Sequence, residues 1–279
     1  MTVTFHPGNQ GYESMTFPAG EQHIKVGPQS QVPYVVIRGA NADDYITAAM
    51  WIDVQHQANR QVAAIVPYLP GARQDRGVPF GAAIYAGLIN SMQADQVIYF
   101  DPHSEVMPGL IENGKRVDVD RVIEEALGEL AHDFYDGVIA PDAVAVHRAQ
   151  LVANILGLPV HQATKERNPQ TGKLSKFVAP EDLPFEGTFL VVDDICDGGG
   201  TFLGLHEAVT GGAPFDPSVI RLDLWVSHGV FSGSIAQSVS LHDRYVNIYT
   251  TNSHPGHGNS VVRAGVLDII SILAEEISL

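Results

Sequence analysis

The chain has 279 residues, 45% of them hydrophobic, which predicts one large or two ordinary globular domains with a buried core. Its formal net charge of −16 argues against non-specific nucleic-acid binding, because such binding needs a basic surface. No run of about 18 apolar residues occurs, so we expect no membrane span.

The N-terminal segment has neither a basic start nor an apolar stretch, so we expect no secretory signal. The single cysteine, Cys196, cannot form an internal disulfide, which fits a reducing compartment. Together these features predict a cytoplasmic protein.

Apolar runs alternate with amphipathic segments along the chain. The expected strands are, in chain order, 62–66, 97–100, 138–140, 188–192, 219–226 and 245–249. The expected helices run from an Asn41 cap to about Ala58, over Phe80 to Leu88, from Val146 to Leu156 before the stop at Gly157, and from Val261 to Ile277. Near-continuous apolar strands between helices predict an α/β fold with mostly parallel sheets covered on both faces.

The strand–helix pattern occurs in two successive sets. The first set covers roughly residues 1–135 and the second roughly residues 136–279, with no low-complexity linker between them. The sequence therefore predicts two domains that meet at this boundary.

Three of the expected strands end in acidic or acid–histidine segments, which are Asp101-Pro-His103, Pro141-Asp142 and Asp193-Asp194. In open parallel sheets, ligands bind outside the carboxyl ends of the strands. An isolated aspartate at a strand end is often only a turn or helix cap. Three such segments at three strand ends predict a functional site.

The strongest local signal is the segment from Phe189 to Thr201, in which an apolar strand leads through two acids into a glycine-rich turn and a helix. Glycines let backbone N–H groups converge on an anion, and the helix N-terminus adds partial positive charge. Thr201 can donate its hydroxyl to a phosphate, and Asp193 and Asp194 can accept hydrogen bonds from sugar hydroxyls. The structural alternative is a glycine-rich turn that merely closes a strand–helix unit.

This segment resembles the phosphoribosyl-pyrophosphate (PRPP) loop of type I phosphoribosyltransferases and ribose-phosphate pyrophosphokinases (PRPP synthetases). Other segments resemble only the second group. Residues 67–76 resemble its ATP-site segment, and residues 17–21 resemble in part a second, N-terminal ATP-site segment. Residues 101–103 resemble its Asp-x-His metal segment, residues 140–142 its second metal position, residues 165–167 the start of its catalytic flexible loop and residues 227–233 a late family segment. The matches follow the family's order over roughly residues 17–233.

The resemblance implies two phosphoribosyltransferase-like domains and a Mg²⁺-dependent enzyme that transfers pyrophosphate from ATP to the anomeric hydroxyl of ribose 5-phosphate, giving PRPP and AMP. It implies a homodimer or larger homo-oligomer, because ATP sites in the family take residues from a neighbouring subunit. The implied roles are catalysis for Lys165 and Arg167, ATP binding for Phe17, Glu21, Arg73 and Gln74, ribose-phosphate binding for Asp193, Asp194, Asp197, Gly198, Gly199, Gly200 and Thr201, and Mg²⁺ binding for His103 and Asp142.

The chain departs from the family pattern at three places. Gly198 stands where the family usually has Thr, and Ala19 stands where it usually has Asp. Arg76 is followed directly by Gly77, where relatives insert a loop that supports oligomer contacts and regulation by phosphate. This shortening predicts weak or absent control by phosphate or ADP.

Three alternative functions stay open at this point. The roomier loop at Gly198 would suit a larger ribose phosphate ester, such as ADP-ribose, as the acceptor. A phosphoribosyltransferase that consumes PRPP is disfavoured by the ATP-site segment 67–76. A non-catalytic, PRPP-synthetase-like subunit is disfavoured by the presence of Lys165, Arg167, His103 and Asp142.

Overall fold

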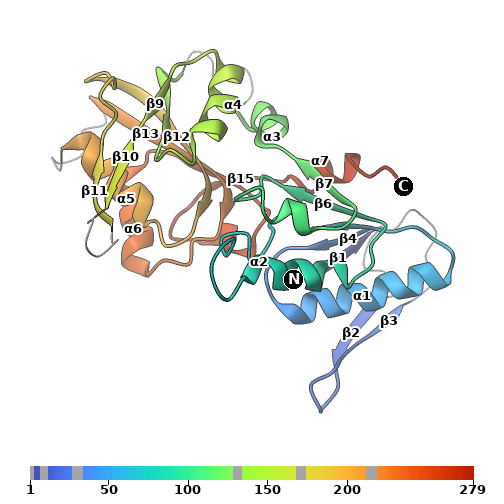
Figure 1. Cartoon of the computed structure of the whole chain (residues 1–279). Coiled ribbons are helices and arrows are strands. Elements are labelled where there is room, and N and C mark those ends of the chain that lie inside the picture. The colour runs from blue at the N-terminus through green and yellow to red at the C-terminus, as the bar shows by residue number, and fades with distance from the viewer. Residues whose placement is uncertain (1–2, 7–11, 27–33, 128–133, 168–173, 212–218) are drawn as a thin grey trace. The chain divides into compact units, whose positions relative to one another are not determined.

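The computed structural model describes residues 3–6, 12–26, 34–127, 134–167, 174–211 and 219–279 (Figure 1). The chain forms two compact units. Unit 1 comprises Met1–Asp118, Ser253–Pro255 and Ile269–Leu279, and unit 2 comprises Val119–Asn252 and Gly256–Asp268.

Unit 1 is built on a sheet that, within its described residues, has five strands in the order β1-β4-β5-β6-β7. These strands are β1 (Val3–His6), β4 (Tyr34–Ile37), β5 (Ala63–Ile65), β6 (Gln96–Phe100) and β7 (Gly114–Val117). All neighbours are parallel except β1, which runs antiparallel to β4 at the edge. A separate antiparallel hairpin joins β2 (Tyr12–Thr16) to β3 (Gln22–Val26). The helical elements are α1 (Ala42–Gln57), α2 (Gly81–Asn90), η1 (Pro108–Leu110) and α7 (Ile270–Glu275).

Helix α1 shows how local sequence and core packing agree in unit 1. The Asn41 side chain accepts the Asp43 N–H at 3.3 Å, and Asp43 and Asp44 place negative charge in the first turn. On the inner face, Trp51 is fully buried and its ring lies 4.9 Å from that of Phe5 on β1. The cap therefore sets where the helix begins, and burial of its aromatic face holds it on the sheet.

Unit 2 is built on a parallel sheet that, within its described residues, has six strands in the order β15-β14-β13-β12-β8-β9. These are β8 (Gly137–Ala140), β9 (Val160–Gln162), β12 (Gly187–Cys196), β13 (Ile220–Gly229), β14 (Ile248–Thr251) and β15 (Gly265–Leu267). A second ladder pairs β10 (Thr164–Arg167) antiparallel to β11 (Leu174–Val178). The helices are α3 (Val119–Leu127), α4 (Val146–Leu156), α5 (Gly200–Thr210) and α6 (Ile235–Arg244), and the 3-10 turn η3 covers Pro255–Gly258.

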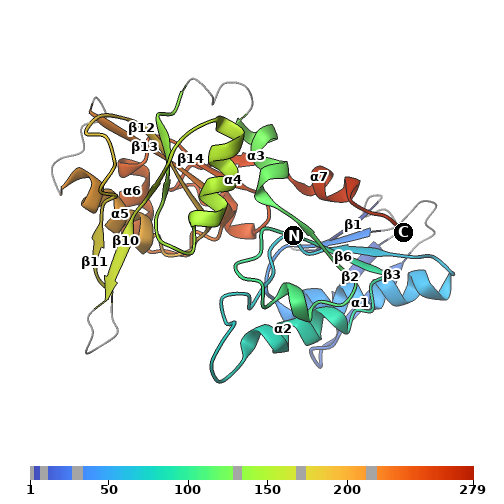
Figure 2. The same cartoon turned by 45° about the horizontal axis from the view of Figure 1, so that its top comes forward.

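The helices of unit 2 cover both faces of its sheet. Helix α4 packs against β8 and β12 and α3 packs on α4, whereas α5 and α6 pack together on the opposite face (Figure 2). Phe189, Val191 and Leu224 pack with Phe202 and Leu205 of α5 in the core of that second face. Burial on both faces explains the unbroken apolar runs at 189–192 of β12 and 224–226 of β13.

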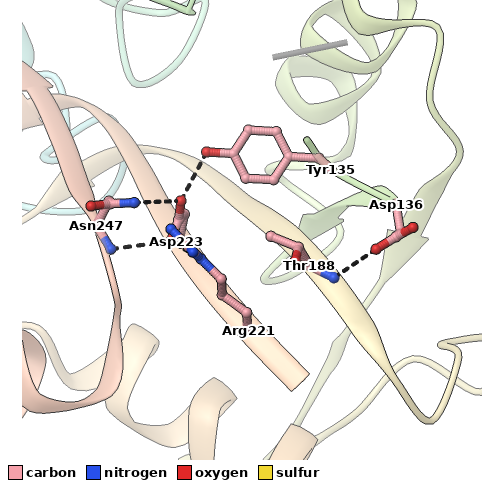
Figure 3. Close-up of polar contacts among 6 residues, drawn as sticks. All are labelled: Tyr135, Asp136, Thr188, Arg221, Asp223 and Asn247. Carbon is pink, nitrogen blue, oxygen red and sulfur yellow. Dashed lines mark hydrogen bonds and ion pairs between the residues drawn. The ribbon is translucent and has the colours of Figure 1, made fainter. Parts of the chain in front are cut away.

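A buried polar network lies near the amino end of β13 (Figure 3). Asp223 is fully buried, and its carboxylate accepts the Tyr135 hydroxyl at 3.0 Å, the Asn247 side-chain amide at 3.0 Å and the Asn247 N–H at 3.1 Å. Arg221 Nε lies 3.5 Å from the same carboxylate. Burial and the Asp223 charge raise the pKa of Tyr135 above its ordinary value. The network ties the start of β8 and the start of β14 to β13.

Most of the predicted elements are present, and the parallel-sheet prediction is confirmed. Helix α4 has the predicted bounds and ends at Gly157 in the left-handed region, with φ of 67°. The predicted strand 245–249 is shifted, because Tyr245 closes α6 and β14 covers 248–251. The predicted helix 261–277 is wrong. Residues 265–267 pair with β14, so only Ile270–Glu275 is helical.

The compact units divide the chain differently from the predicted domains 1–135 and 136–279. Unit 1 ends at Asp118, because α3 packs on α4 of unit 2. The C-terminal segment returns to unit 1, where α7 packs against β5 and β6. Contacts of two helices therefore decide the observed division.

Candidate functional site

The glycine-rich turn of unit 2 connects β12 to the N-terminus of α5. Gly199 has φ of 79°, a conformation that L side chains rarely adopt. A Cβ atom at Gly199 would also lie 2.4 Å from Leu241 Cδ1. The left-handed backbone thus favours glycine at this position, and any side chain there would also push Leu241 aside. The turn presents its backbone at a helix N-terminus, the geometry that binds anions.

Gly198 and Gly200 are under no such constraint. No heavy atom lies within 4 Å of the position that a Cβ atom would take at either residue. Gly198 also lies outside the left-handed region of φ. The place where the family usually has a Thr side chain is therefore open space.

Two carboxylates precede the turn on β12, the strand between β8 and β13. Asp194 is buried, Asp193 is half-buried, and the Asp194 N–H donates to Asp193 Oδ1 at 2.9 Å. Burial, followed by the negative charge of Asp194, raises the pKa of Asp193 well above its ordinary value, while the charge of Arg148 on α4 opposes this. A close carboxylate pair at the carboxyl end of a central strand, with the pKa of one member raised, marks a candidate functional site.

Lys165 of β10 and Asp142, which follows β8, are brought together. Lys165 Nζ lies 2.5 Å from Asp142 Oδ2 and 5.4 Å from the centroid of the Phe177 ring. Asp142 Oδ1 accepts the N–H groups of Val144 at 2.9 Å and Ala145 at 3.1 Å, so this aspartate also orders the turn that leads into α4. Burial favours the neutral form of Asp142, but the Lys165 contact and the two N–H bonds outweigh it and lower its pKa.

Arg167 is placed only by its backbone, which lies on β10 opposite Leu174. Its side chain lies outside the described part of the chain, and so do residues 168–173, where the flexible loop implied by the resemblance would continue. Asp142 follows β8, and β8 pairs with β12, so Asp142 and the glycine-rich turn lie at the same edge of the unit 2 sheet.

The predicted ATP-site residues Arg73 and Gln74 lie in unit 1 after β5, and both are exposed. The segment folds back on α2: the Ala82 N–H donates to the Gln74 carbonyl at 3.1 Å, and a Cβ atom at Gly81 would lie 1.9 Å from Gln74 Oε1. His103 is half-buried and follows β6, the neighbour of β5. These segments therefore share the carboxyl edge of the unit 1 sheet, whereas Asp142 belongs to unit 2.

Phe17 and Glu21 are brought together in the turn of the β2–β3 hairpin. The Phe17 N–H donates to the Glu21 carbonyl at 2.8 Å, and Gly20 has φ of 99°. Both side chains are exposed, and the Phe17 ring lies 5.4 Å from that of His23. The hairpin thus presents both residues at one tip.

Two residues near the turn were not singled out from the sequence. The Ser232 hydroxyl donates to the carboxylate of Asp197, and Arg148 provides positive charge near Asp193. Ser232 is 35 residues from Asp197 in the chain. It lies in the late family segment 227–233, which was the one sequence signal that could have drawn attention to it.

Among the described residues, no group of three or more His, Cys, Asp or Glu side chains is placed to hold a metal ion. A search of the same part of the chain finds no helix with the length and apolar character needed to span a membrane.

No family model matches the chain. It is 28% identical to a ribose-phosphate pyrophosphokinase of Pyrococcus abyssi, over 98% of this chain and 94% of that protein. It is 27% identical to ribose-phosphate pyrophosphokinase 3 of Saccharomyces cerevisiae, over 93% of this chain and 83% of that protein.

The fold is also similar to that of a solved structure, a phosphoribosylpyrophosphate synthetase from Mycobacterium smegmatis. The TM-score is 0.73 at 22% identity, over 95% of this chain and 88% of that one. Sequence similarity extends over nearly the whole chain, and unit 2 carries the glycine-rich turn at the expected strand end. The chain is therefore similar over nearly its whole length to ribose-phosphate pyrophosphokinases, and its fold of two phosphoribosyltransferase-like α/β units is similar to that of a phosphoribosylpyrophosphate synthetase.

Proposed function

We propose that the protein transfers the pyrophosphoryl group of ATP to the anomeric hydroxyl of ribose 5-phosphate, giving PRPP and AMP. The observation that carries this proposal is the turn at Gly199, which combines a left-handed backbone, a helix N-terminus and two preceding carboxylates. The names of the relatives in Pyrococcus and yeast support the same reaction.

The turn would hold the 5-phosphate of the acceptor. Backbone N–H groups of Asp197 to Thr201 and the Thr201 hydroxyl are donors suited to phosphate oxygens. Asp193 and Asp194 would accept hydrogen bonds from the sugar hydroxyls. Because burial and mutual repulsion disfavour the charge on Asp193, donors from a bound sugar would stabilise that charge.

The nucleotide would be held by residues of unit 1. Arg73 and Gln74 lie within segment 67–76, which resembles the family's ATP-site segment. Phe17 and Glu21 at the hairpin tip would add contacts to the nucleotide. Transfer of a phosphoryl-type group depends on positioning and charge neutralisation more than on covalent help from the protein. Lys165 and Arg167 would neutralise charge that develops in the transition state.

Mg²⁺ is the cofactor that this proposal implies, with His103 and Asp142 as the residues that would hold it. Asp142 fits in chemical type, since carboxylate oxygens suit this cation, and Oδ2 is the oxygen open to exchange because Oδ1 already accepts the N–H groups of Val144 and Ala145. When bound, Mg²⁺ would neutralise phosphate charge. Lys165 contacts Asp142 Oδ2 in this structure, so it would leave that oxygen before a cation binds there.

The test is an AMP-release assay with ATP, Mg²⁺ and a panel of ribose phosphates, with PRPP identified by mass. We expect AMP and PRPP in equal amounts with ribose 5-phosphate. The variant Gly199→Ala should lose this activity, because alanine is strained at a φ of 79° and its Cβ atom would displace Leu241, whereas Gly200→Ala has open space and serves as the matched control. If no acceptor releases AMP, the proposal fails.

A second acceptor is favoured by one observation, the open space beside Gly198. A diester such as ADP-ribose needs room for its substituent next to the phosphate, and a Thr side chain would occupy that room. AMP release with ADP-ribose and not with ribose 5-phosphate would make the larger ester the substrate.

A further inference from the structure

Ordering the three consecutive glycines at 198–200 has a large cost in conformational entropy, because glycine loses more conformational freedom on folding than any other residue. A turn of this kind binds phosphate well only if the surrounding structure holds its shape before the ligand arrives. The segment between β13 and α6, residues 230–234, is what packs against it.

Backbone contacts from this segment support the turn at its start. The N–H groups of Val230 and Phe231 both donate to the Cys196 carbonyl, at 3.0 and 2.9 Å. The Gly198 carbonyl oxygen lies 3.0 Å from the position of a Cβ atom at Gly233, so only glycine fits there without a shift. These contacts bring residues 230–233 directly alongside the turn.

The supporting segment is itself held in place. Phe231 has φ of 45°, which is unfavourable for a bulky residue and needs compensating contacts. Its carbonyl accepts the Asn259 side-chain amide at 3.1 Å, and Asn259 Oδ1 accepts the Val261 N–H at 2.9 Å. Ser234 begins α6 with a reciprocal cap, since its N–H donates to the Gln237 side chain at 2.9 Å. Ser232 therefore lies between two anchored residues.

We propose that Ser232 is a positioning residue for the ribose-phosphate turn and acts through Asp197. Its hydroxyl donates to the Asp197 carboxylate. An aspartate in a turn readily accepts hydrogen bonds from nearby backbone N–H groups, which are the donors that a phosphate needs. The negative charge of the aspartate would also repel the phosphate directly. By holding the carboxylate, Ser232 keeps these donors available to the ligand. This inference rests on the proposed function of the turn as a phosphate site.

The experiment measures binding of ribose 5-phosphate and of inorganic phosphate to the full chain by calorimetry, together with KM and kcat. In Ser232→Ala we expect the dissociation constant and KM for ribose 5-phosphate to rise roughly tenfold, the loss expected for one charge-assisted hydrogen bond, with kcat within about twofold of wild type. Ser232→Thr keeps the hydroxyl and should bind nearly as wild type. Ser240→Ala on α6 is the matched control and should change nothing.

A double-mutant cycle tests whether Ser232 acts through Asp197. In an Asp197→Ala background, Ser232→Ala should have no further effect on binding, because there is no carboxylate left to hold. Unchanged binding in Ser232→Ala, or an equal loss in the Asp197→Ala background, would overturn the inference while leaving the phosphate site intact. A wild-type protein that binds neither probe would overturn both the inference and the proposed function.

Discussion

Asp193 illustrates how a functional residue can oppose stability. Its carboxylate is disfavoured by burial and by the neighbouring charge of Asp194, so its pKa is raised in the folded protein. We predict that Asp193→Asn raises the melting temperature at pH 7 by roughly 2–4 °C, the shift expected for about 1 kcal/mol in a protein of this size. The same variant should lose most of its activity, because the amide is a poorer acceptor for sugar hydroxyls.

The pH dependence of this effect follows from its sign. When the pKa of a carboxyl group is higher in the folded protein than in the unfolded chain, the group destabilises the folded protein only when it is ionised. Its contribution to stability is therefore fully present below the pKa of the unfolded chain and is lost as pH rises through the pKa of the folded protein. The difference between Asp193→Asn and wild type should therefore shrink as pH falls toward the ordinary carboxyl range near 4. Thermal unfolding from pH 4 to 8 measures it, with exposed Asp243→Asn as control. A variant less stable than wild type at pH 7 would contradict the burial argument.

Gly198 is a position in the turn where a side chain can be added without straining the backbone. A side chain there meets no atom within 4 Å and needs no left-handed backbone. We predict that Gly198→Thr improves use of ribose 5-phosphate and impairs use of ADP-ribose, if the latter is accepted. The added hydroxyl can donate to a phosphate monoester, which carries about one more negative charge than a diester near neutral pH.

The measurement is the ratio of kcat/KM for the two acceptors in wild type and in Gly198→Thr. Gly200→Ala, which also has open space around its new side chain, is the control for disturbance of the turn. A ratio that stays constant or moves toward ADP-ribose would show that Gly198 does not select the acceptor.

Lys165 should matter for the rate of transfer and much less for binding of ATP. We predict that Lys165→Ala lowers kcat by at least about a hundredfold, because a contact to charge that develops in the transition state is worth several kcal/mol only there. ATP affinity should change little. The control is Lys115→Ala, which breaks a comparable pair, 2.8 Å from Glu276, in unit 1. A near-normal kcat in Lys165→Ala would remove this residue from the mechanism.

At the scale of elements, the Asp223 network links β13 both to the start of β14, its neighbour in the sheet, and to the start of β8, which no backbone ladder joins to β13 directly. The Tyr135 hydroxyl and both donors of Asn247 meet at one fully buried carboxylate (Figure 3). We predict that Asp223→Ala lowers the free energy of unfolding by about 3–5 kcal/mol, because it leaves Tyr135, Asn247 and Arg221 without their shared acceptor. Tyr135→Phe removes a single donor and should cost about 1–2 kcal/mol.

Urea unfolding of the full chain at pH 7 measures both variants. The ordering is the informative result, since the carboxylate serves several donors and the hydroxyl serves one acceptor. If Tyr135→Phe is as destabilising as Asp223→Ala, the packing of the ring and not the shared carboxylate holds these segments together.

The elements differ in how far the sequence predicts them. Helix α4 could be predicted residue by residue, since its periodicity ends at a glycine cap that needs a left-handed backbone. The ladders β2–β3 and β10–β11 were not predicted, because their strands are short and the segments Tyr12–Thr16 and Thr164–Arg167 lack the apolar alternation that marks a strand. The segment 261–277 looked helical from its apolar residues, but pairing with β14 overrides that tendency for 265–267.

At the scale of the whole molecule, the charge of −16 makes self-association depend on uncharged surface. Helix α2 offers such a surface: none of its residues is charged, and Ile84 is 72% exposed next to the exposed Val78 and Phe80. A helix that is apolar on all sides is normally covered. We therefore predict that two copies of the chain meet at this face and form a homo-oligomer.

Light scattering coupled to size-exclusion chromatography tests this prediction. Wild type should elute as a dimer or larger, and Ile84→Lys should shift the protein toward the monomer, because a buried charge without a partner is strongly unfavourable at an interface. Ile46→Lys, on the exposed side of α1, is the matched control and should leave the assembly unchanged. A monomeric wild-type protein would contradict the predicted oligomer.

The sequence by itself determined the α/β class, the strand β12 and the glycine turn that follows it, because these features are written in contiguous residues. An apolar run, a left-handed glycine and a helix start each act over a few positions. Only the tertiary structure decided that Lys165 meets Asp142, that Ser232 meets Asp197, and that α7 returns to unit 1. Those pairs are 23 and 35 residues apart, and their meeting depends on strand order and packing summed over the whole unit, which no local pattern contains.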